Sequence, residues 1–305
     1  MRVGGAPLVA VGVARRLVVA GVARALGDTP GALDEYREPP GDPGLFGPGS
    51  VAWQVHADLP AMLVGGVSSL MLQTLHPLAM AGVAEHSRYR EDPFGRLQRT
   101  ARFVAGTTFG GHDLVERLVA EVRAVHRGVR GVARDGRRYS AGDPSLLTFV
   151  HVAEVWSFLR SYQRYGPRPL VRSEKDRYLS EVAEVARLLG ARDVPGSVDD
   201  VRSYLREVRG QLAATPEAHD AVRFLRRPFG DRPVDALAHR VVAEAAIDLL
   251  PGFARRELGV GRAPAARAAP VRGAGAALAA ALRWAVGPSL VRAAATERVR
   301  AAGTA

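Results

Sequence analysis

The stretch from Leu59 to Ala84 constrains the fold more than any other part of the chain, because it contains no Asp, Glu, Lys or Arg. It is long enough to cross a membrane, but polar residues and a proline occupy its middle, between Ser68 and Pro77. A helix that is apolar on almost every side belongs in the interior of a protein. We therefore predict a buried central helix over 61–84, kinked at Pro77, and no transmembrane helix.

The rest of the chain follows helical spacing, with glycine and proline residues separating the segments. We predict helices over residues 1–27, 94–108, 113–131, 144–164, 173–189, 198–212, 236–250 and 275–300, and a further helix that starts at Thr215. No segment shows the alternation or the turn spacing of a β-sheet. The sequence therefore predicts an all-α fold with a single helical domain.

The chain contains no cysteine, which limits the cofactors that it can bind. Disulfides, iron–sulfur clusters, thiolate-ligated haem and cysteine zinc sites are excluded. A metal ion would have to be bound by histidine, carboxylate or another oxygen or nitrogen ligand. The P-loop, the Gly-x-Ser-x-Gly elbow, His-Glu-x-x-His and the paired Glu-x-x-His motifs of di-iron proteins are also absent from the sequence. Phosphoryl transfer and serine hydrolysis are therefore not indicated.

Arginine gives the chain a strongly basic balance. The formal net charge is +11, but Lys175 is the only lysine and the arginines are spread along the whole chain. This pattern indicates a GC-rich coding bias, so we predict no nucleic-acid partner. The apolar N-terminal segment is interrupted by Arg15 and Arg16 and lacks the features of a secretory signal. We therefore predict a cytoplasmic protein with at most peripheral membrane contact.

A group of polar side chains shares one face of the predicted helix 94–108. Arg96, Arg99, Thr100 and Phe103 recur at short helical steps and project from the same side. Such a stripe can offer hydrogen-bond donors to a ligand that is both apolar and anionic. It can equally be a solvated basic face on which only the aromatic ring turns inward.

Three histidines are predicted to point toward the core. His126 follows Val122 and Val125 on the apolar side of the helix 113–131, His76 lies in the central helix, and His151 lies on an inward face of the helix 144–164. An inward imidazole is either a hydrogen-bonded core residue or a ligand of a metal or of haem iron. A neutral imidazole nitrogen in an apolar pocket suits an axial position on iron.

Four segments, in this order, resemble the catalytic-domain family of the oxygenase MpaB and of rubber oxygenase (latex-clearing protein). They are Leu72–Ser87, Asp92–Thr100, Val125–Gly131 and Tyr139–His151. The resemblance implies a globin-like helical core that binds haem b.

The resemblance sets the expected limits of the central domain, and composition sets those of the segments on either side. Residues 45–260 would form the haem domain, in a branch distinct from the rubber-cleaving members. Residues 1–44 would form an N-terminal helix and an arm rich in proline and glycine. Residues 261–305 would form a linker, over 261–275, and a C-terminal helix that packs on the core.

The resemblance assigns roles to individual residues. Arg96 and Thr100 match the arginine and threonine of an Arg-x-x-Lys-Thr motif on the distal side of the haem, and His126 is the best match for the axial histidine. The lysine of that motif is replaced by Arg99, whose guanidinium stays protonated and cannot coordinate iron. Rubber cleavage itself is therefore not predicted. Glu85 is one candidate for the family's catalytic glutamate.

These observations lead to the hypothesis of a haem b-dependent oxygenase that uses dioxygen or peroxide to oxidise a small apolar molecule, including an unsaturated one. Its iron ligand would be His126, and its catalytic residues would be Arg96, Arg99 and Thr100. The other residues assigned to the cofactor pocket are His76, His151 and Phe103. The sequence indicates no electron donor.

Two other functions remain open. One is a non-catalytic helical protein that binds a lipid or a protein partner, with purely structural histidines. The other is a non-haem enzyme whose metal is bound by His76, His126 and His151.

Overall fold

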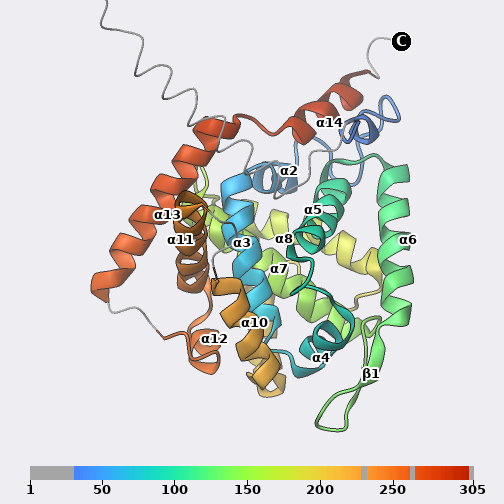
Figure 1. Ribbon diagram of the computed structural model, residues 1–305. Coiled ribbons are helices and arrows are strands. Elements are labelled where there is room, and N and C mark those ends of the chain that lie inside the picture. The colour runs from blue at the N-terminus through green and yellow to red at the C-terminus, as the bar shows by residue number, and fades with distance from the viewer. Residues whose placement is uncertain (1–30, 228–231, 262–264, 302–305) are drawn as a thin grey trace, which may run out of the picture.

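A computed structural model describes residues 31–227, 232–261 and 265–301 of the chain. Helices dominate this part, and the all-α prediction is confirmed (Figure 1). The predicted helix over 1–27 lies outside the described residues.

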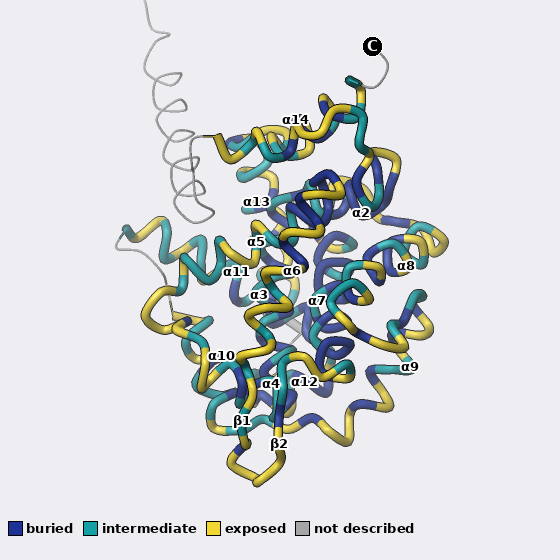
Figure 2. The backbone as a smooth tube through the Cα atoms, turned by 90° about the vertical axis from the view of Figure 1, so that its right-hand side faces the viewer, coloured by how far each residue is buried: buried dark blue, intermediate teal, exposed yellow. Residues whose placement is uncertain are grey.

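Two helices form the centre of the molecule, α3 (Leu59–Gln73) and α7 (Pro144–Tyr165), which pack along each other. The buried residues of α7 run along the interior in Figure 2. Gly65 allows this close approach, because a Cβ atom there would lie 2.9 Å from Cδ1 and 3.0 Å from Cα of Phe158. Asp143 starts α7 as predicted, since its side chain accepts hydrogen bonds from the backbone of the first turn.

The predicted kink at Pro77 is a complete break. The helix α3 ends at Gln73, and α4 (Pro77–His86) continues at an angle of 106° to it. Proline lacks an N–H group and is favoured in the first turn of a helix, so Pro77 begins a new helix. The prediction of one continuous helix over 61–84 was therefore wrong.

The other helices surround this central pair. They are α2 (Val51–His56), α5 (Pro93–Phe109), α6 (His112–Gly128), α8 (Arg172–Leu189), α9 (Val198–Glu207), α10 (Pro216–Arg226), α11 (Pro233–Leu249), α12 (Gly252–Glu257), α13 (Ala265–Val286) and α14 (Leu290–Arg300), with the short 3-10 helices η1 (Asp34–Tyr36) and η2 (Val208–Gln211). Figure 1 shows α11 and α13 on one side of α3 and α5 and α6 on the other. The helices α2 and α8 pack on α7.

Three further features differ from the sequence prediction. A short antiparallel hairpin, β1 (Arg130–Val132) and β2 (Arg138–Ser140), follows α6 where no strand was predicted. The helix α13 already begins at Ala265, inside the predicted linker 261–275. The predicted helix over 275–300 is interrupted between α13 and α14, where Gly287 has a φ of +75°.

The arm rich in proline and glycine packs against the C-terminal helix. The buried guanidinium of Arg298 in α14 donates from Nε to the carbonyl oxygen of Asp42 and from Nη1 to that of Tyr36, both at 2.8 Å. The backbone N–H of Gly41 donates to the carbonyl oxygen of Arg298 at 2.7 Å. The arm is therefore fixed in place by α14.

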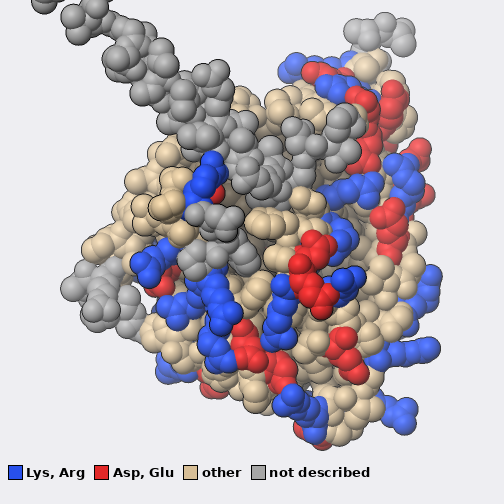
Figure 3. Space-filling model, in the orientation of Figure 1, with Lys and Arg blue, Asp and Glu red and all other residues tan. Residues whose placement is uncertain are grey.

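Among the described residues, no single helix has both the length and the apolar character to span a membrane. Two pairs of helices that are bent at a break, α3 with α4 and residues 268–286 with α14, together meet the criteria of length and composition alone. On the face shown in Figure 3, arginine side chains alternate with carboxylates.

Candidate active site

The four segments singled out in the sequence meet where α4, α5, the end of α6 and the hairpin come together. Gly82 of α4 lies against Val129 and Tyr139, since an added Cβ would be 3.4 Å from Val129 Cγ1 and 3.5 Å from Tyr139 Cε2. Arg96 of α5 donates from Nη1 to Ser87 Oγ, just beyond α4, at 2.5 Å. Segments far apart in sequence therefore build one region. We call the region around Gly82, Ser87, Arg96, Val129 and Tyr139 the motif cluster.

Arg96 is the half-buried cation of this cluster. Asp92 caps α5 by accepting a hydrogen bond from the Gly95 N–H at 2.8 Å, and Arg96 follows in the first turn. The guanidinium carbon of Arg96 lies 5.9 Å from the centroid of the Tyr89 ring. Burial lowers the pKa of Arg96 from its ordinary value, with a raising contribution from Tyr89. A partly desolvated charge acts more strongly on its neighbours than one in water.

Arg99 and Thr100 point to solvent from the same helix. The Arg99 side chain is 70% exposed, with Nη1 at 3.5 Å from Asp92 Oδ2. The exposed Thr100 hydroxyl donates to the backbone carbonyl of Arg96 at 3.1 Å. The stripe expected from the sequence is thus divided, because only Arg96 and Phe103 are half-buried.

His126 lies in the last turn of α6 and is half-buried. Leu114 and Leu118 are buried in the first half of this helix, whereas Val125 is 65% exposed, so the expected apolar side is covered only in part. The placement of Val125 on the buried side was therefore wrong. Burial lowers the pKa of His126, and no hydrogen bond joins its imidazole to another residue in the part of the chain that the structure describes.

The helices α5 and α6 are antiparallel neighbours joined by a short connection at Gly110 and Gly111. Gly106 permits close packing near this connection, because a Cβ there would collide with the Leu118 side chain. The start of α5, which carries Arg96, and the end of α6, which carries His126, therefore lie at the same end of the pair (Figure 1).

Glu85 forms a hydrogen-bonded group with the hairpin. The Tyr139 hydroxyl donates to Glu85 Oε2, and His86 Nε2 lies 3.2 Å from the same hydroxyl. Burial, followed by the hydrogen bond and the charge of Glu85, raises the pKa of Tyr139 to about 12. The position opposite Tyr139 requires a glycine, because a Cβ atom on Gly131 would lie 2.6 Å from the Tyr139 hydroxyl oxygen. Glu85 is therefore already bound to a tyrosine that stays protonated.

His76 packs against α7, within reach of the charges of the hairpin. Its ring lies 5.1 Å from that of Phe149 in α7, and burial lowers its pKa to about 4, with a further contribution from Arg137. The described residues contain no group of three or more His, Asp and Glu side chains placed to hold a metal ion. The structure therefore does not assemble the alternative metal site from His76, His126 and His151.

A small cavity lies between α2, α5, α7 and α8, and we call it the inner cavity. Its volume is about 30 Å³, and most of its lining is apolar, including the predicted residue Phe103. Its polar lining residues are His56, Thr107, Thr108, His151 and Glu154. Two predicted site residues, Phe103 and His151, therefore meet here and not at the motif cluster.

His56 was not identified as a site residue from the sequence. Its Nδ1 lies 2.7 Å from Thr108 Oγ1, and its Nε2 lies 2.9 Å from the Tyr178 hydroxyl. The Thr108 hydroxyl donates its own proton to the carbonyl of Val104 at 2.6 Å, so Nδ1 must carry the imidazole proton and Nε2 accepts from Tyr178. Burial, assisted by His151, lowers the pKa of His56 to about 3, which keeps the ring neutral.

His151 and Glu154 remain without hydrogen-bond partners in this cavity. The Nε2 atom of His151 is buried without a partner in the described structure, and burial lowers the pKa of this residue to about 4. No described group donates to the Glu154 carboxyl, whose pKa is raised to about 7 by burial. The His-x-x-Glu spacing on α7 is the signal that could have identified this pair.

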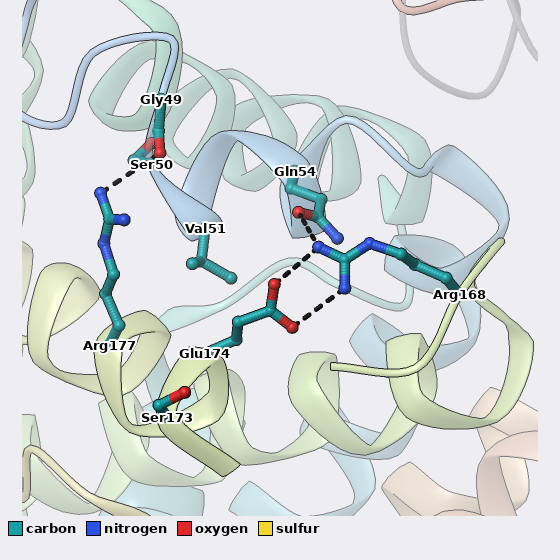
Figure 4. Close-up of a pocket in the computed structure, with 8 residues that line it drawn as sticks. All are labelled: Gly49, Ser50, Val51, Gln54, Arg168, Ser173, Glu174 and Arg177. Carbon is teal, nitrogen blue, oxygen red and sulfur yellow. Dashed lines mark hydrogen bonds and ion pairs between the residues drawn. The ribbon is translucent and has the colours of Figure 1, made fainter. Parts of the chain in front are cut away.

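A larger hollow of about 390 Å³ opens on the surface between α2 and α8 (Figure 4). Arg168 donates to both carboxylate oxygens of Glu174, at 2.9 and 2.6 Å, and to Gln54 Oε1 at 3.2 Å. Arg177 donates to the carbonyl oxygen of Gly49. Because these polar groups bind one another, the hollow has fewer free hydrogen-bonding groups for a ligand than the inner cavity has.

Comparison with known proteins identifies one family. Residues 53–284 match the model of the family described as ER-bound oxygenase mpaB/B'/Rubber oxygenase, catalytic domain. This range includes every predicted site residue. No curated protein and no solved structure matches the chain.

Proposed function

The chain belongs to the mpaB/rubber oxygenase catalytic-domain family, and from this premise we propose that it is a haem b-dependent oxygenase. Its substrates would be dioxygen and a small apolar molecule. The observation that carries the proposal is the half-buried, neutral imidazole of His126, which lies at the same end of the α5–α6 pair as Arg96.

The donor chemistry at His126 fits a haem. An axial position requires a neutral imidazole nitrogen that is free to bind iron, and the His126 ring makes no hydrogen bond to another described residue. The inner cavity does not fit, because about 30 Å³ is far below the 300–1,000 Å³ or so of ordinary ligand pockets. We therefore assign the haem to the partly exposed end of the α5–α6 pair.

When bound, haem b supplies the iron that activates dioxygen. The chain's own residues orient and stabilise the reacting groups. The guanidinium of Arg96 stabilises negative charge that develops on oxygen, and its partial burial strengthens this effect. The Thr100 hydroxyl, whose proton goes to the Arg96 carbonyl oxygen, would accept a hydrogen bond one turn further along the helix. Arg99 cannot coordinate iron and would pair with a haem propionate.

The remaining predicted pocket residues receive different roles. Phe103 lines the inner cavity and would contribute apolar surface there. His76 packs on Phe149, and His151 lines the inner cavity, so neither is proposed as a haem contact.

Absorption spectroscopy of the full-length protein, expressed with added haem, tests the proposal. We expect a Soret band that is lost in His126→Ala. His239→Ala is the matched control, because His239 is half-buried like His126 but lies on α11, on the other side of α3 from α6 (Figure 1), and should leave the band unchanged. A colourless wild-type protein, or a His126→Ala protein with an unchanged band, would favour the non-catalytic binding protein.

A further inference from the structure

We propose that the inner cavity binds the oxygen-bearing end of an otherwise apolar molecule, namely the carbonyl or hydroxyl group of a long aliphatic compound. This inference names the substrate class of the proposed oxygenase and rests on that proposal for the role as substrate. The binding itself depends on the cavity alone.

The polar groups of the cavity divide into two sets. His56, Thr108 and Tyr178 satisfy one another through the hydrogen bonds described above, and the Thr108 hydroxyl proton goes to the backbone of Val104. His151 is only 9% exposed, and its Nε2 atom has no partner among the described residues. A buried polar atom without a partner costs about 1–3 kcal/mol, so a molecule that forms a hydrogen bond with Nε2 would be stabilised in this cavity.

Glu154 provides the second unpartnered group, one helical turn from His151 on α7. Burial raises its pKa to about 7, so the carboxyl carries a proton below this pH and can donate a hydrogen bond. A ligand carbonyl would accept from this proton. A ligand hydroxyl could in addition donate to His151, whose lowered pKa keeps the ring neutral.

The walls of the cavity select the rest of the ligand. They are formed by aromatic and valine side chains from α5, α7 and α8 and by Phe46, which precedes α2. A volume of about 30 Å³ exceeds the 10–15 Å³ or so that one water needs, and so admits a polar group of few atoms. The chain attached to it would leave through the partly exposed side, where Phe46 and Phe103 lie.

An uncharged ligand fits these surroundings best. The polar groups that face Glu154 or its neighbours are His56 from α2, Thr107 and Thr108 from α5, His151 from α7 and Tyr178 from α8. The charge of Arg187 from α8 acts on His151 and lowers its pKa further. Burial keeps both imidazoles neutral and raises the pKa of the Tyr178 hydroxyl, which Glu154 and Glu181 raise further. Bringing a charged group into such a cavity would cost more than an uncharged oxygen does.

Calorimetric titration of the full-length protein with decanone, decanol and decane tests the proposal. Below pH 7 we expect decanone and decanol to bind about tenfold more tightly than decane, the value of one good hydrogen bond. Above pH 7 decanone should lose this advantage, because Glu154 no longer carries a proton. Decane that binds as tightly as decanone, or a decanone affinity that is equal on both sides of pH 7, would overturn the proposal.

Two variants separate binding from folding. His151→Leu removes a buried unpartnered nitrogen, so its stability should equal or exceed that of the wild type while its affinity for decanol falls about tenfold. Glu154→Gln keeps a donor at every pH, so it should bind decanone without pH dependence. Glu116→Gln, on the exposed side of α6, is the matched control and should behave as the wild type. Wild-type affinity for decanol in His151→Leu would contradict the proposal.

The same samples report on the haem separately. The Soret band depends on His126, whereas the titration depends on His151 and Glu154. A protein that binds decanone but no haem would refute the oxygenase proposal alone, and a haem-bound protein without preference for decanone would refute only the role of the cavity.

Discussion

Arg283 of α13 reaches the cap of the central helix, donating from Nε and Nη2 to the two carboxylate oxygens of Asp58 at 2.7 and 2.9 Å. The same carboxylate accepts the backbone N–H of Ala61 and so begins α3. The guanidinium also donates to the carbonyl oxygen of Tyr165 at the end of α7. One side chain from the C-terminal region thus holds the ends of both central helices.

Removing this cation should destabilise the protein strongly. The Asp58 side chain is 8% exposed and that of Arg283 is 30% exposed, so Arg283→Ala leaves a nearly buried carboxylate without its counterion. We expect the free energy of unfolding in urea to fall by about 3 kcal/mol. Arg137→Ala is the control, because the Arg137 and Asp135 side chains are 50% and 45% exposed, and its effect should stay below about 1 kcal/mol. Equal losses in the two variants would contradict this assignment.

The interface between α3 and α7 predicts opposite effects for two neighbouring glycines. A Cβ at Gly65 would lie 2.9 Å from Phe158 Cδ1 and 3.1 Å from the Ser157 carbonyl oxygen, whereas at Gly66 the nearest atom is Phe158 Cε1 at 3.9 Å. Gly65→Ala should therefore lower the unfolding free energy by about 1–3 kcal/mol. Gly66→Ala should be neutral or stabilising by up to about 1 kcal/mol, since alanine favours the helix. Thermal melts of both variants would show whether the order is reversed.

Buried histidines predict a loss of stability in mild acid. Burial lowers the pKa of His56 to about 3 and those of His76 and His151 to about 4, below the ordinary value of 6.5. Between these values the unfolded chain binds more protons than the folded one, so unfolding becomes easier as the pH falls from 6.5 toward 4.

The variant His76→Leu isolates one of these contributions. Its unfolding free energy, measured across the same pH range, should depend less on pH than that of the wild type, because one proton-binding site of the unfolded chain is gone. Identical slopes for the two proteins would show that His76 does not contribute.

Local signals in the sequence account for the helix ends. Asp143 caps α7, Thr215 caps α10 by accepting the Ala218 N–H, and Gly190 ends α8 with a φ of +107°, each as the residue type predicts. These effects depend on a few adjacent residues. They are therefore visible in the sequence before the packing is known.

Tertiary packing decides what the sequence could not predict. Periodicity placed Val125 with Leu118 on one side of α6. Whether neighbouring helices extend far enough to cover Val125 cannot be predicted from the sequence of α6 itself. The strands of the hairpin have three residues each, too few to show an alternating pattern. Pro77 signalled a disruption, while the angle of 106° depends on what α4 packs against.

The candidate site was predictable only in part for the same reason. Four short segments were enough to indicate the family, and their meeting at the motif cluster follows from it. The inner cavity depends on His56, in a helix of six residues, and on its partners Thr108 and Tyr178, which lie far away in sequence. No spacing rule connects residues on three different helices.

Arg298 makes the two ends of the described chain depend on each other. The arm that it fixes contains Asp42, which accepts hydrogen bonds from the backbone and ring of His112 at the start of α6. The arm is followed directly by Phe46, which lines the inner cavity. Removal of α14 would therefore displace the residues at the entrance of the cavity and at the start of α6, the helix that carries His126. The helix α14 thus stabilises the surroundings of the inner cavity, although none of the residues that line this cavity belongs to α14.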